Sequence, residues 1–298
     1  MKLVSITPVR NEAHVIGLSL RALLRWVDEA IVLCHSCTDE TMDIAYEVAR
    51  ENVGRVHVIE ERDRVWREMA QRQRLLDGAR ALNATHVAHV DADEVLTSNL
   101  LHTIRGAVEI LRPGGLLQIP MPCIWGGIDS YAIRAESRHG SYVARWNESV
   151  TSIAFADSPA LAWRSAAAGY DHHHREPYGA RIEQRHPGLG GLMHLQFADA
   201  RRITAKHALY KMTERIRWPA KAVRDIDAMY NLAVKPQVLR LAQCPAEWWG
   251  GYQDIMHHYK PDTEPWQIAE CERLMEEYGA ETFTGLDLFG VVAPGVAA

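Results

Sequence analysis

The first 120 residues of the chain alternate short apolar runs with longer segments of helical period. The apolar runs predict strands at residues 2–7, 30–33, 56–59, 86–90 and 116–120. Between them, apolar residues recur every three or four positions and predict helices from Asn11, from Thr38 or Asp39, over residues 65–82, and from Ser98. Strands that alternate with helices in this way are typical of a mostly parallel, Rossmann-like sheet flanked by helices, so the predicted class is α/β.

The pattern changes twice in the rest of the chain. Residues 121–198 carry short alternating stretches, such as 141–146 and 151–155, among loops rich in Gly, Pro and His, and predict irregular antiparallel strands. Residues 199–298 are helical in period, with helices expected over 199–218, 222–234, 245–259 and 265–278 and a loose terminus from Gly279. We therefore expect an α/β half at 1–120, an irregular region at 121–198 and a helical extension at 199–298, within one domain.

Composition narrows the class of protein. The formal net charge of −5 argues against a protein whose affinity depends on neutralising many phosphates. No run approaches the roughly 18 apolar residues of a membrane span, and the N-terminus turns polar too early for a secretory signal. The five cysteines are too few and too scattered for a disulfide framework. We expect a cytoplasmic protein without a transmembrane segment.

The most informative chemistry is Asp91-Ala92-Asp93, which directly follows the apolar run at residues 86–90. In an extended segment residues i and i+2 point to the same side, so Asp91 and Asp93 are expected to converge. The repulsion between two carboxylates is relieved by a divalent cation, and oxygen ligands favour Mg²⁺ or Mn²⁺. Such an ion at the carboxyl end of a strand suits the departure of a diphosphate. The alternative is that these acids only cap the next helix.

Three ordered stretches resemble the family 2 glycosyltransferases of the GT-A fold. They are I-T-P-V-R-N-E at residues 6–12, I-V-L-C-H-S-C-T-D-E-T at 31–41 and A-T-H-V-A-H-V-D-A-D-E-V-L at 84–96. The resemblance implies a nucleotide-sugar site in residues 1–120, an acceptor side in 121–198, and inverting transfer of a hexosyl or pentosyl group. It implies donor-binding roles for Pro8, Val9, Arg10, Asn11, Glu12, His35, Arg74, Asp91 and Ala92, with Asp93 holding the metal. Where the family frequently has an acidic residue, this chain has Cys34-His35, which leaves the nucleobase open.

The residues that follow Asp91-Ala92-Asp93 include candidates for a third metal ligand and for a general base. His194 is the histidine chosen as a metal ligand beside Asp93 and Asp91, because many GT-A enzymes return a later histidine to the metal; an imidazole favours Mn²⁺ over Mg²⁺. The alternative is a histidine satisfied within a strand. For the carboxylate that deprotonates the acceptor, Glu148 is the first choice because it follows Trp146 and Asn147, and Asp171 is the second. A solvated strand residue is the alternative for Glu148.

Other motifs have two interpretations each. Cys34-His35-Ser36-Cys37 has the spacing of a redox motif, but it coincides with a nucleotide-loop position, which is the favoured interpretation. Trp248-Trp249 would suit a sugar platform, whereas core packing or a dimer contact is favoured, so a homo-oligomer stays open. Arg201, Arg202, Lys206, Lys211, Arg215, Arg217 and Lys221 form either a solvated face or a clamp for phosphates.

The leading hypothesis is a metal-dependent glycosyltransferase that uses a nucleotide-sugar donor. A nucleotidyltransferase is the second hypothesis and is less favoured, because residues 6–12 lack the glycines of the loop that such enzymes usually carry. A non-catalytic nucleotide-sugar-binding protein is the third hypothesis. The acceptor stays open among a glycan, a lipid-linked sugar, a small molecule, a protein and a modified nucleobase in DNA.

Overall fold

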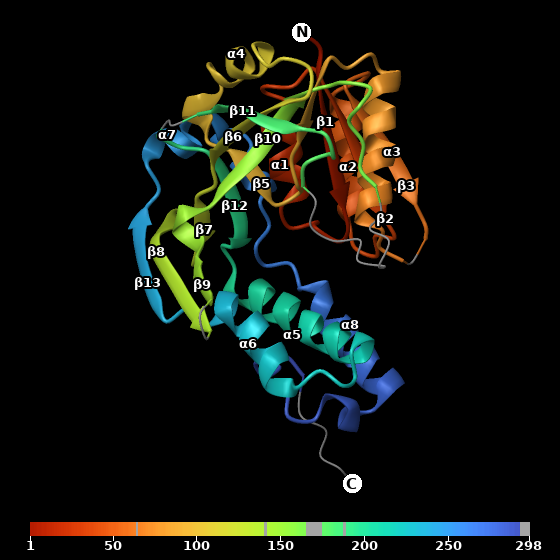
Figure 1. The fold of residues 1–298 in the computed structure, drawn as a ribbon, viewed down its shortest axis with the longest axis vertical. Coiled ribbons are helices and arrows are strands. Elements are labelled where there is room, and N and C mark those ends of the chain that lie inside the picture. The colour runs from red at the N-terminus through yellow and green to blue at the C-terminus, as the bar shows by residue number, and fades with distance from the viewer. Residues whose placement is uncertain (64, 140–141, 165–174, 187–188, 293–298) are drawn as a thin grey trace. The chain divides into compact units, whose positions relative to one another are not determined.

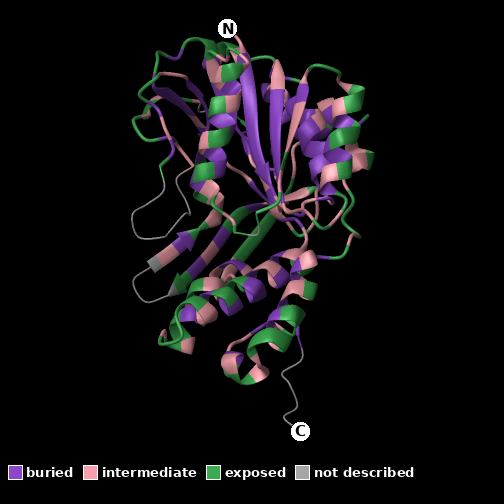
Figure 2. Cartoon of the chain, turned by 90° about the vertical axis from the view of Figure 1, so that its right-hand side faces the viewer, coloured by how far each residue is buried: buried purple, intermediate pink, exposed green. Residues whose placement is uncertain are grey.

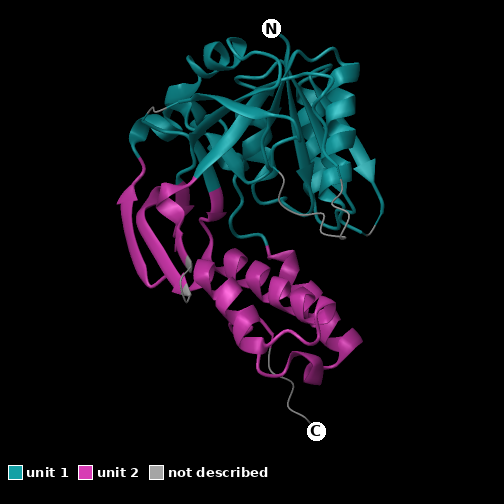
Figure 3. Ribbon diagram, in the orientation of Figure 1, with its two compact units in different colours: residues 1–122, 150–194, 245–263 teal, residues 123–149, 195–244, 264–298 magenta. Residues whose placement is uncertain are grey.

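The computed structural model describes residues 1–63, 65–139, 142–164, 175–186 and 189–292. They form two compact units (Figure 3). Unit 1 comprises residues 1–122, 150–194 and 245–263, and unit 2 comprises residues 123–149, 195–244 and 264–298. Each unit is therefore built from three separate stretches of sequence, and each is described by itself below.

Unit 1 is built on a sheet whose described strands follow the order β11-β6-β10-β4-β1-β2-β3 (Figure 1). Strands β4, β1, β2 and β3 run parallel, with Ile6 opposite both Ile31 and His89. The strands are β1 (Leu3–Val9), β2 (Glu29–His35), β3 (Val56–Glu61), β4 (His86–His89), β6 (Gly115–Pro120), β10 (Val150–Ala156) and β11 (Arg181–Arg185). The predicted α/β class with a parallel-rich sheet is confirmed.

Helices cover both faces of this sheet, and β1 is buried along its whole length (Figure 2). Helices α1 (Ile16–Leu23), α2 (Thr41–Glu51) and α4 (Ile104–Glu109) pack on the face of Leu3 and Val32. Helix α3 (Glu68–Ala81) packs on the opposite face, with Val4 and Ile31. Because successive strand residues point to opposite faces, a strand buried on both sides reads as the continuous apolar run seen in the sequence.

In the sheet of unit 1, β10 lies between β6 and β4 and runs antiparallel to both. Two of the expected helix starts in this unit need correction. Asn11 does not cap a helix: its φ is 54°, in the left-handed region, and α1 begins five residues later at Ile16. Similarly, Ser98 begins only the short 3₁₀ turn Ser98–Leu100, and α4 starts at Ile104.

The helix expected over residues 245–259 is also wrong. The chain forms α7 (Ala246–Trp249) and two 3₁₀ turns, Gly250–Tyr252 and Met256–His258. Both Trp248 and Trp249 are 6% exposed, and the Tyr252 hydroxyl donates to Leu96 O at 2.8 Å. These aromatic side chains are therefore part of the packing of unit 1.

Unit 2 combines an antiparallel sheet with helices. Strand β8 (Ser130–His139) pairs with β7 (Cys123–Trp125), β9 (Tyr142–Arg145) and β13 (Val238–Gln243), of which β13 was not predicted. The helices are α5 (Ala200–Arg217), α6 (Val223–Val234) and α8 (Trp266–Tyr278). The terminus is not loose over its described part, because Phe283, Leu288 and Val292 pack against α5 and α8. Among the described residues, no helix combines the length and apolarity needed to cross a bilayer.

The basic residues of α5 are largely engaged inside unit 2. Arg201 pairs with Glu264 and Arg202 with Asp199, while Lys221, which follows α5, pairs with Glu214 of this helix. Lys211 is fully buried, and its ammonium donates to Asn231 Oδ1 at 2.7 Å and pairs with Asp227 Oδ1 at 2.8 Å. These contacts favour a structural role for the basic stripe over a clamp for phosphates.

Candidate functional site

The Asp91-Ala92-Asp93 turn lies at the carboxyl end of β4, next to the end of β1. Strand β4 ends at His89, and β5 (Glu94–Leu96) starts directly after the turn. The Thr7 hydroxyl donates to Val90 O at 2.8 Å, and the Asp91 N–H donates to Glu94 Oε2 at 2.8 Å. The turn is thus held by β1 on one side and by its own Glu94 on the other, at the edge of the sheet where ligands bind in open α/β folds.

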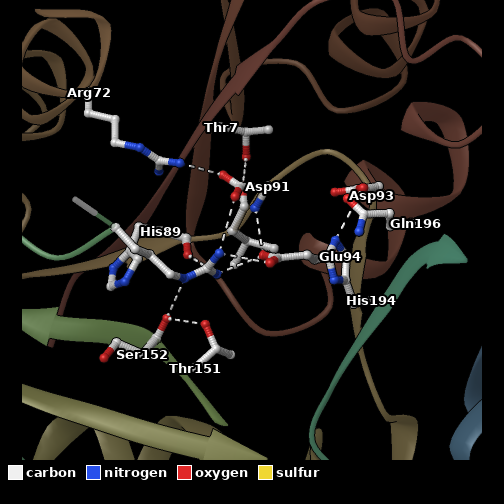
Figure 4. A network of polar contacts seen from close by, with 12 residues as sticks. Thr7, Arg72, His89, Asp91, Asp93, Glu94, Thr151, Ser152, His194 and Gln196 are labelled. Carbon is white, nitrogen blue, oxygen red and sulfur yellow. Dashed lines mark hydrogen bonds and ion pairs between the residues drawn. The ribbon is translucent and has the colours of Figure 1, made fainter. Parts of the chain in front are cut away.

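Both carboxylate oxygens of Asp91 face arginines (Figure 4). Oδ1 accepts from Arg72 Nη2 at 2.9 Å, and Oδ2 accepts from Arg175 Nη1 at 3.1 Å. Arg175 also reaches Glu94, with Nη1 2.8 Å from Oε1 and Nη2 2.7 Å from Oε2. The Asp91 carboxylate is therefore neutralised by two guanidinium groups of the protein itself.

Arg175 uses all of its donors in this network. Besides the carboxylates, its Nε donates to Ser152 O at 2.9 Å and its Nη2 to His89 O at 3.0 Å. A guanidinium has five N–H donors, and all five have protein acceptors here. Arg175 therefore holds β4, β10 and the turn together, and it has no donor left for a ligand.

Burial and the arginines set the charges of these groups. Burial raises the pKa of Asp91, but Arg72 and Arg175 outweigh it and bring the pKa below its usual value. Burial raises the pKa of Glu94 above its usual value; Arg175 lowers the pKa and Asp91 raises it, but burial has the largest effect. Burial, Arg175 and Arg72 bring the pKa of His89 well below its usual value, so its imidazole is neutral. The cluster combines an ionised Asp91 with a buried Glu94 that is ionised less readily.

Asp93 and His194 lie together on the other side of the turn. His194 is on β12 (Leu192–Phe197), where it is opposite Glu94 of β5, and its Nε2 is 3.4 Å from Asp93 Oδ2 (Figure 4). Both side chains are partly exposed, Asp93 to 16% and His194 to 21%. Of the three predicted ligands, the structure thus pairs Asp93 with His194, while Asp91 faces the arginines.

The side chains around the turn offer few ligands for a divalent cation. Within the part of the chain that the structure describes, no three His, Cys, Asp or Glu side chains are grouped to hold a metal ion. Mg²⁺ and similar ions, however, are usually held by one or two carboxylates together with substrate phosphates. Asp93 and His194 fit such a two-ligand site, whereas both oxygens of Asp91 are already engaged.

The loop after β1 is fastened to the loop after β2. The side chain of Asn11 bonds twice to Thr38, as donor to Oγ1 at 3.0 Å and as acceptor from the backbone N–H at 2.7 Å. The Glu12 N–H donates to Thr41 Oγ1 at 2.7 Å. The left-handed conformation of Asn11 allows this double contact. Of the predicted donor-binding residues 8–12, Pro8 and Val9 end β1, and residues 10–12 lie in the loop that is fastened to residues 38–41.

His35 and Arg74 occupy different environments. His35 ends β2 and is fully buried, with its ring edge-on to Trp66 at 5.1 Å between centroids. Burial and the nearby Arg10 lower the pKa of His35. The side chain of Arg74 is 50% exposed and pairs with Glu61 at 2.9 Å, on the surface of α3. The buried arginine of this helix is Arg72, which is 4% exposed.

Three residues of this cluster were not assigned a role from the sequence: Arg72, Glu94 and Arg175. The helical pattern could have identified Arg72 as a buried residue, because it falls in the buried stripe of α3 with Met69, Leu76 and Ala79. A charged side chain in an apolar stripe needs a buried partner. Arg175 had no such signal, since it follows three histidines far along the chain and meets Asp91 only in the folded state.

The two predicted general bases are in other parts of the chain. Glu148 is exposed at the end of the 3₁₀ turn Trp146–Glu148 in unit 2. In the same turn, Trp146 packs on Phe197 at 5.5 Å between centroids, and Asn147 Oδ1 accepts from the Ala135 N–H. Asp171 and the neighbouring histidines 172–174 lie outside the described residues. His207 is buried on α5, where its Nδ1 is 2.9 Å from Tyr230 O.

Comparisons with known proteins give structural matches only. No protein-family model matches the chain, and no curated protein matches it. A solved structure of residues 1–349 of TarS from S. aureus aligns over 99% of this chain and 88% of that chain, with 12% identity and a TM-score of 0.44. The structure of these TarS residues in complex with UDP-GlcNAc aligns over 42% of this chain and 35% of that chain, with 22% identity and a TM-score of 0.36.

A further match is glucosyl-3-phosphoglycerate synthase from Mycobacterium tuberculosis, solved with Mn²⁺, UDP and phosphoglyceric acid. It aligns over 41% of this chain and 43% of that chain, with 17% identity and a TM-score of 0.29. This chain aligns with only 22% of the length of another solved TarS structure. With identities below 25% and TM-scores below 0.5, the matches do not assign an activity, which is argued from the site instead.

Proposed function

We propose that this protein is a metal-dependent glycosyltransferase that moves a hexosyl or pentosyl group from a nucleotide-sugar donor to an acceptor hydroxyl, with inversion. The observation that carries the proposal is the pairing of Asp93 with His194 beside an Asp91 held by two arginines, at the carboxyl end of β4. Asp93 and His194 would hold Mn²⁺ or Mg²⁺. The bound ion would supply positive charge to the leaving diphosphate.

Arg72 offers a hydrogen-bond donor that could bind the nucleotide-sugar substrate directly. Its Nε is bound to Glu68 and its Nη2 to Asp91, but its buried Nη1 has no hydrogen-bond partner among the described residues. A buried unpaired donor is costly, and an anionic ligand removes that cost by accepting from it. We infer that Arg72 Nη1 donates to the donor substrate, with its guanidinium oriented by Glu68 and Asp91.

The acceptor hydroxyl must lose its proton to a carboxylate during the attack on the anomeric carbon. Glu148 is our first candidate, because it is an exposed carboxylate in the same turn as Trp146, and Asp171 is the second. The inverting outcome rests on the sequence resemblance. A nucleotidyltransferase would release pyrophosphate where a glycosyltransferase releases a nucleoside diphosphate, so product analysis separates the two reactions.

The decisive experiment is a thermal-shift panel of nucleoside diphosphates with and without Mn²⁺. A ligand present at about 100 times its dissociation constant adds about 2.7 kcal/mol of stability. We expect one diphosphate to stabilise the wild type in a metal-dependent manner, and we expect Asp93→Asn to lose most of that shift, since an amide is a weaker ligand for the ion.

The matched control is Asp77→Asn, which changes a carboxylate that is 63% exposed on α3. This variant should keep the full metal-dependent shift. Equal shifts in the wild type and Asp93→Asn would remove Asp93 from the site and contradict the proposed function.

A further inference from the structure

Cys34 and Cys37 meet where β1 and β2 end. Cys34, in β2, is opposite Val9 of β1, and Cys37 Sγ lies 3.8 Å from the carbonyl oxygen of the same Val9. Ser36 has a φ of 42°, a left-handed turn that brings the chain back towards β1. Cys37 packs against the apolar cluster that contains Val9 and Cys34, its thiol interacts with that of Cys34, and both cysteines are free. The spacing noted in the sequence therefore corresponds to two neighbouring thiols at the ends of β1 and β2.

The two thiols differ in environment. Cys34 is only 1% exposed, whereas Cys37 is partly exposed. The hydrogen bond with Cys37, together with burial, raises the pKa of Cys34. The hydrogen bond with Cys34 lowers the pKa of Cys37, and the Asn11 N–H lowers it further. Cys37 is thus the accessible, more readily ionised sulfur, and Cys34 is the protected one, a division of roles that suits thiol–disulfide exchange.

We propose that Cys34 and Cys37 form a thiol–disulfide exchange site that reacts with low-molecular-weight disulfides such as oxidised glutathione. The Cys37 thiolate attacks one glutathione sulfur, breaking the glutathione disulfide and releasing one reduced glutathione. Cys34 then loses its proton and attacks the Cys37 sulfur, which releases the second. The two thiols give up two protons and two electrons, and both electrons go to the glutathione disulfide.

Oxidation is coupled to the loop that follows β1. A disulfide brings the sulfurs to about 2.05 Å, so Cys37 must move towards Cys34. The residues after Cys37 hold that loop: Thr38 bonds twice to Asn11, and Asp39 Oδ2 accepts from the Ala13 N–H at 3.1 Å. We infer that the disulfide weakens these bonds and loosens residues 10–13. A consequent loss of donor binding rests on the function proposed above.

Peptide mapping tests the chemistry. Trypsin cleavage after Arg25 and Arg50 releases one peptide that contains both Cys34 and Cys37 and no other cysteine. After incubation of the folded protein with excess oxidised glutathione, we expect this peptide to lose two hydrogens in mass and to resist alkylation. Excess reduced glutathione should restore two alkylatable thiols. A peptide that still alkylates twice after oxidation, or that carries glutathione on both cysteines, would overturn the proposal.

Hydrogen–deuterium exchange tests the coupling to residues 10–13. We expect their amides to exchange faster in the oxidised wild type than in the reduced protein. Cys37→Ser should show no response to glutathione. Cys244→Ser is the matched control, because Cys244 is also partly exposed with its Sγ 3.8 Å from a carbonyl oxygen, that of Ile128, and this variant should respond like the wild type. Unchanged or slower exchange in the oxidised wild type would overturn the coupling.

These readouts do not depend on any nucleotide. If no nucleoside diphosphate stabilises the protein, the proposed transferase function is contradicted but the proposed thiol–disulfide exchange site is not. Conversely, an intact panel together with an unreactive peptide would remove the exchange site alone.

Discussion

Arg175 lies between two carboxylates that would otherwise repel each other. Asp91 and Glu94 both bond to it, and Glu94 is 1% exposed. A buried charge that loses its partner is expensive, typically by 3–5 kcal/mol, whereas exposed ion pairs contribute about 0–1 kcal/mol. The arginine is therefore expected to matter first for the stability of the turn that carries Asp93.

We predict that Arg175→Met lowers the free energy of unfolding by about 3–5 kcal/mol, because it leaves the buried Glu94 without its counter-charge and Asp91 with Arg72 alone. Urea denaturation followed by circular dichroism measures the change. Arg62→Met is the control, since Arg62 pairs with Glu60 while 84% exposed and should leave stability close to that of the wild type. Similar losses in the two variants would contradict the importance of the buried network.

Helices α5 and α6 are joined by a buried histidine. His207 of α5 is 9% exposed, and its Nδ1 is 2.9 Å from Tyr230 O of α6. Burial lowers the pKa of His207 from 6.5 to about 4. As the pH falls below about 6.5, the unfolded chain takes up a proton that the folded His207 does not, so the folded state loses stability until about pH 4.

We predict that this histidine contributes about 2 kcal/mol of the stability lost between pH 7 and pH 5. His207→Gln removes the titration and keeps a side-chain donor for Tyr230 O, so its stability should fall less over this range. Urea midpoints at the two pH values measure the difference. A variant that loses as much stability as the wild type would show that the folded His207 takes up a proton as readily as the unfolded chain does.

Each of the two units has apolar clusters of its own, and unit 2 also depends on a buried charge. Lys211 is fully buried, with Asp227 and Asn231 as partners, and its ammonium lies 3.9 Å from the centroid of the Phe289 ring. Phe289 belongs to the terminal segment that packs on α5 and α8. A single buried lysine thus links α5, α6 and the last described residues of the chain.

We predict that Lys211→Ala destabilises unit 2 by about 3–5 kcal/mol, because Asp227 loses its buried counter-charge. Hydrogen exchange followed peptide by peptide should show faster opening of α5, α6 and α8, while the strands of unit 1 keep their protection. Equal deprotection of β1, β2 and β4 would show that the units unfold as one body.

The apolar pattern by itself determined the α/β half, because strands buried on both faces appear as short apolar runs and helices as three- or four-residue periods. It also placed Asp91 and Asp93 directly after a strand, since local order along the chain decides which residues follow β4. An antiparallel strand at residues 151–155 was expected, but its position between β4 and β6 was not, nor was the strand β13, because the pairing of distant strands leaves no period in the sequence.

Only the tertiary structure decided the environment of each acid. Asp91 and Asp93 are two residues apart, yet one faces Arg72 and Arg175 while the other faces His194. Arg175 is 84 residues from Asp91 along the chain, and its five hydrogen bonds exist only once β4 and β10 pair. Local sequence sets which side chains are present at the edge of the sheet, whereas their partners, and hence their charges, depend on contacts between segments that are far apart in the chain.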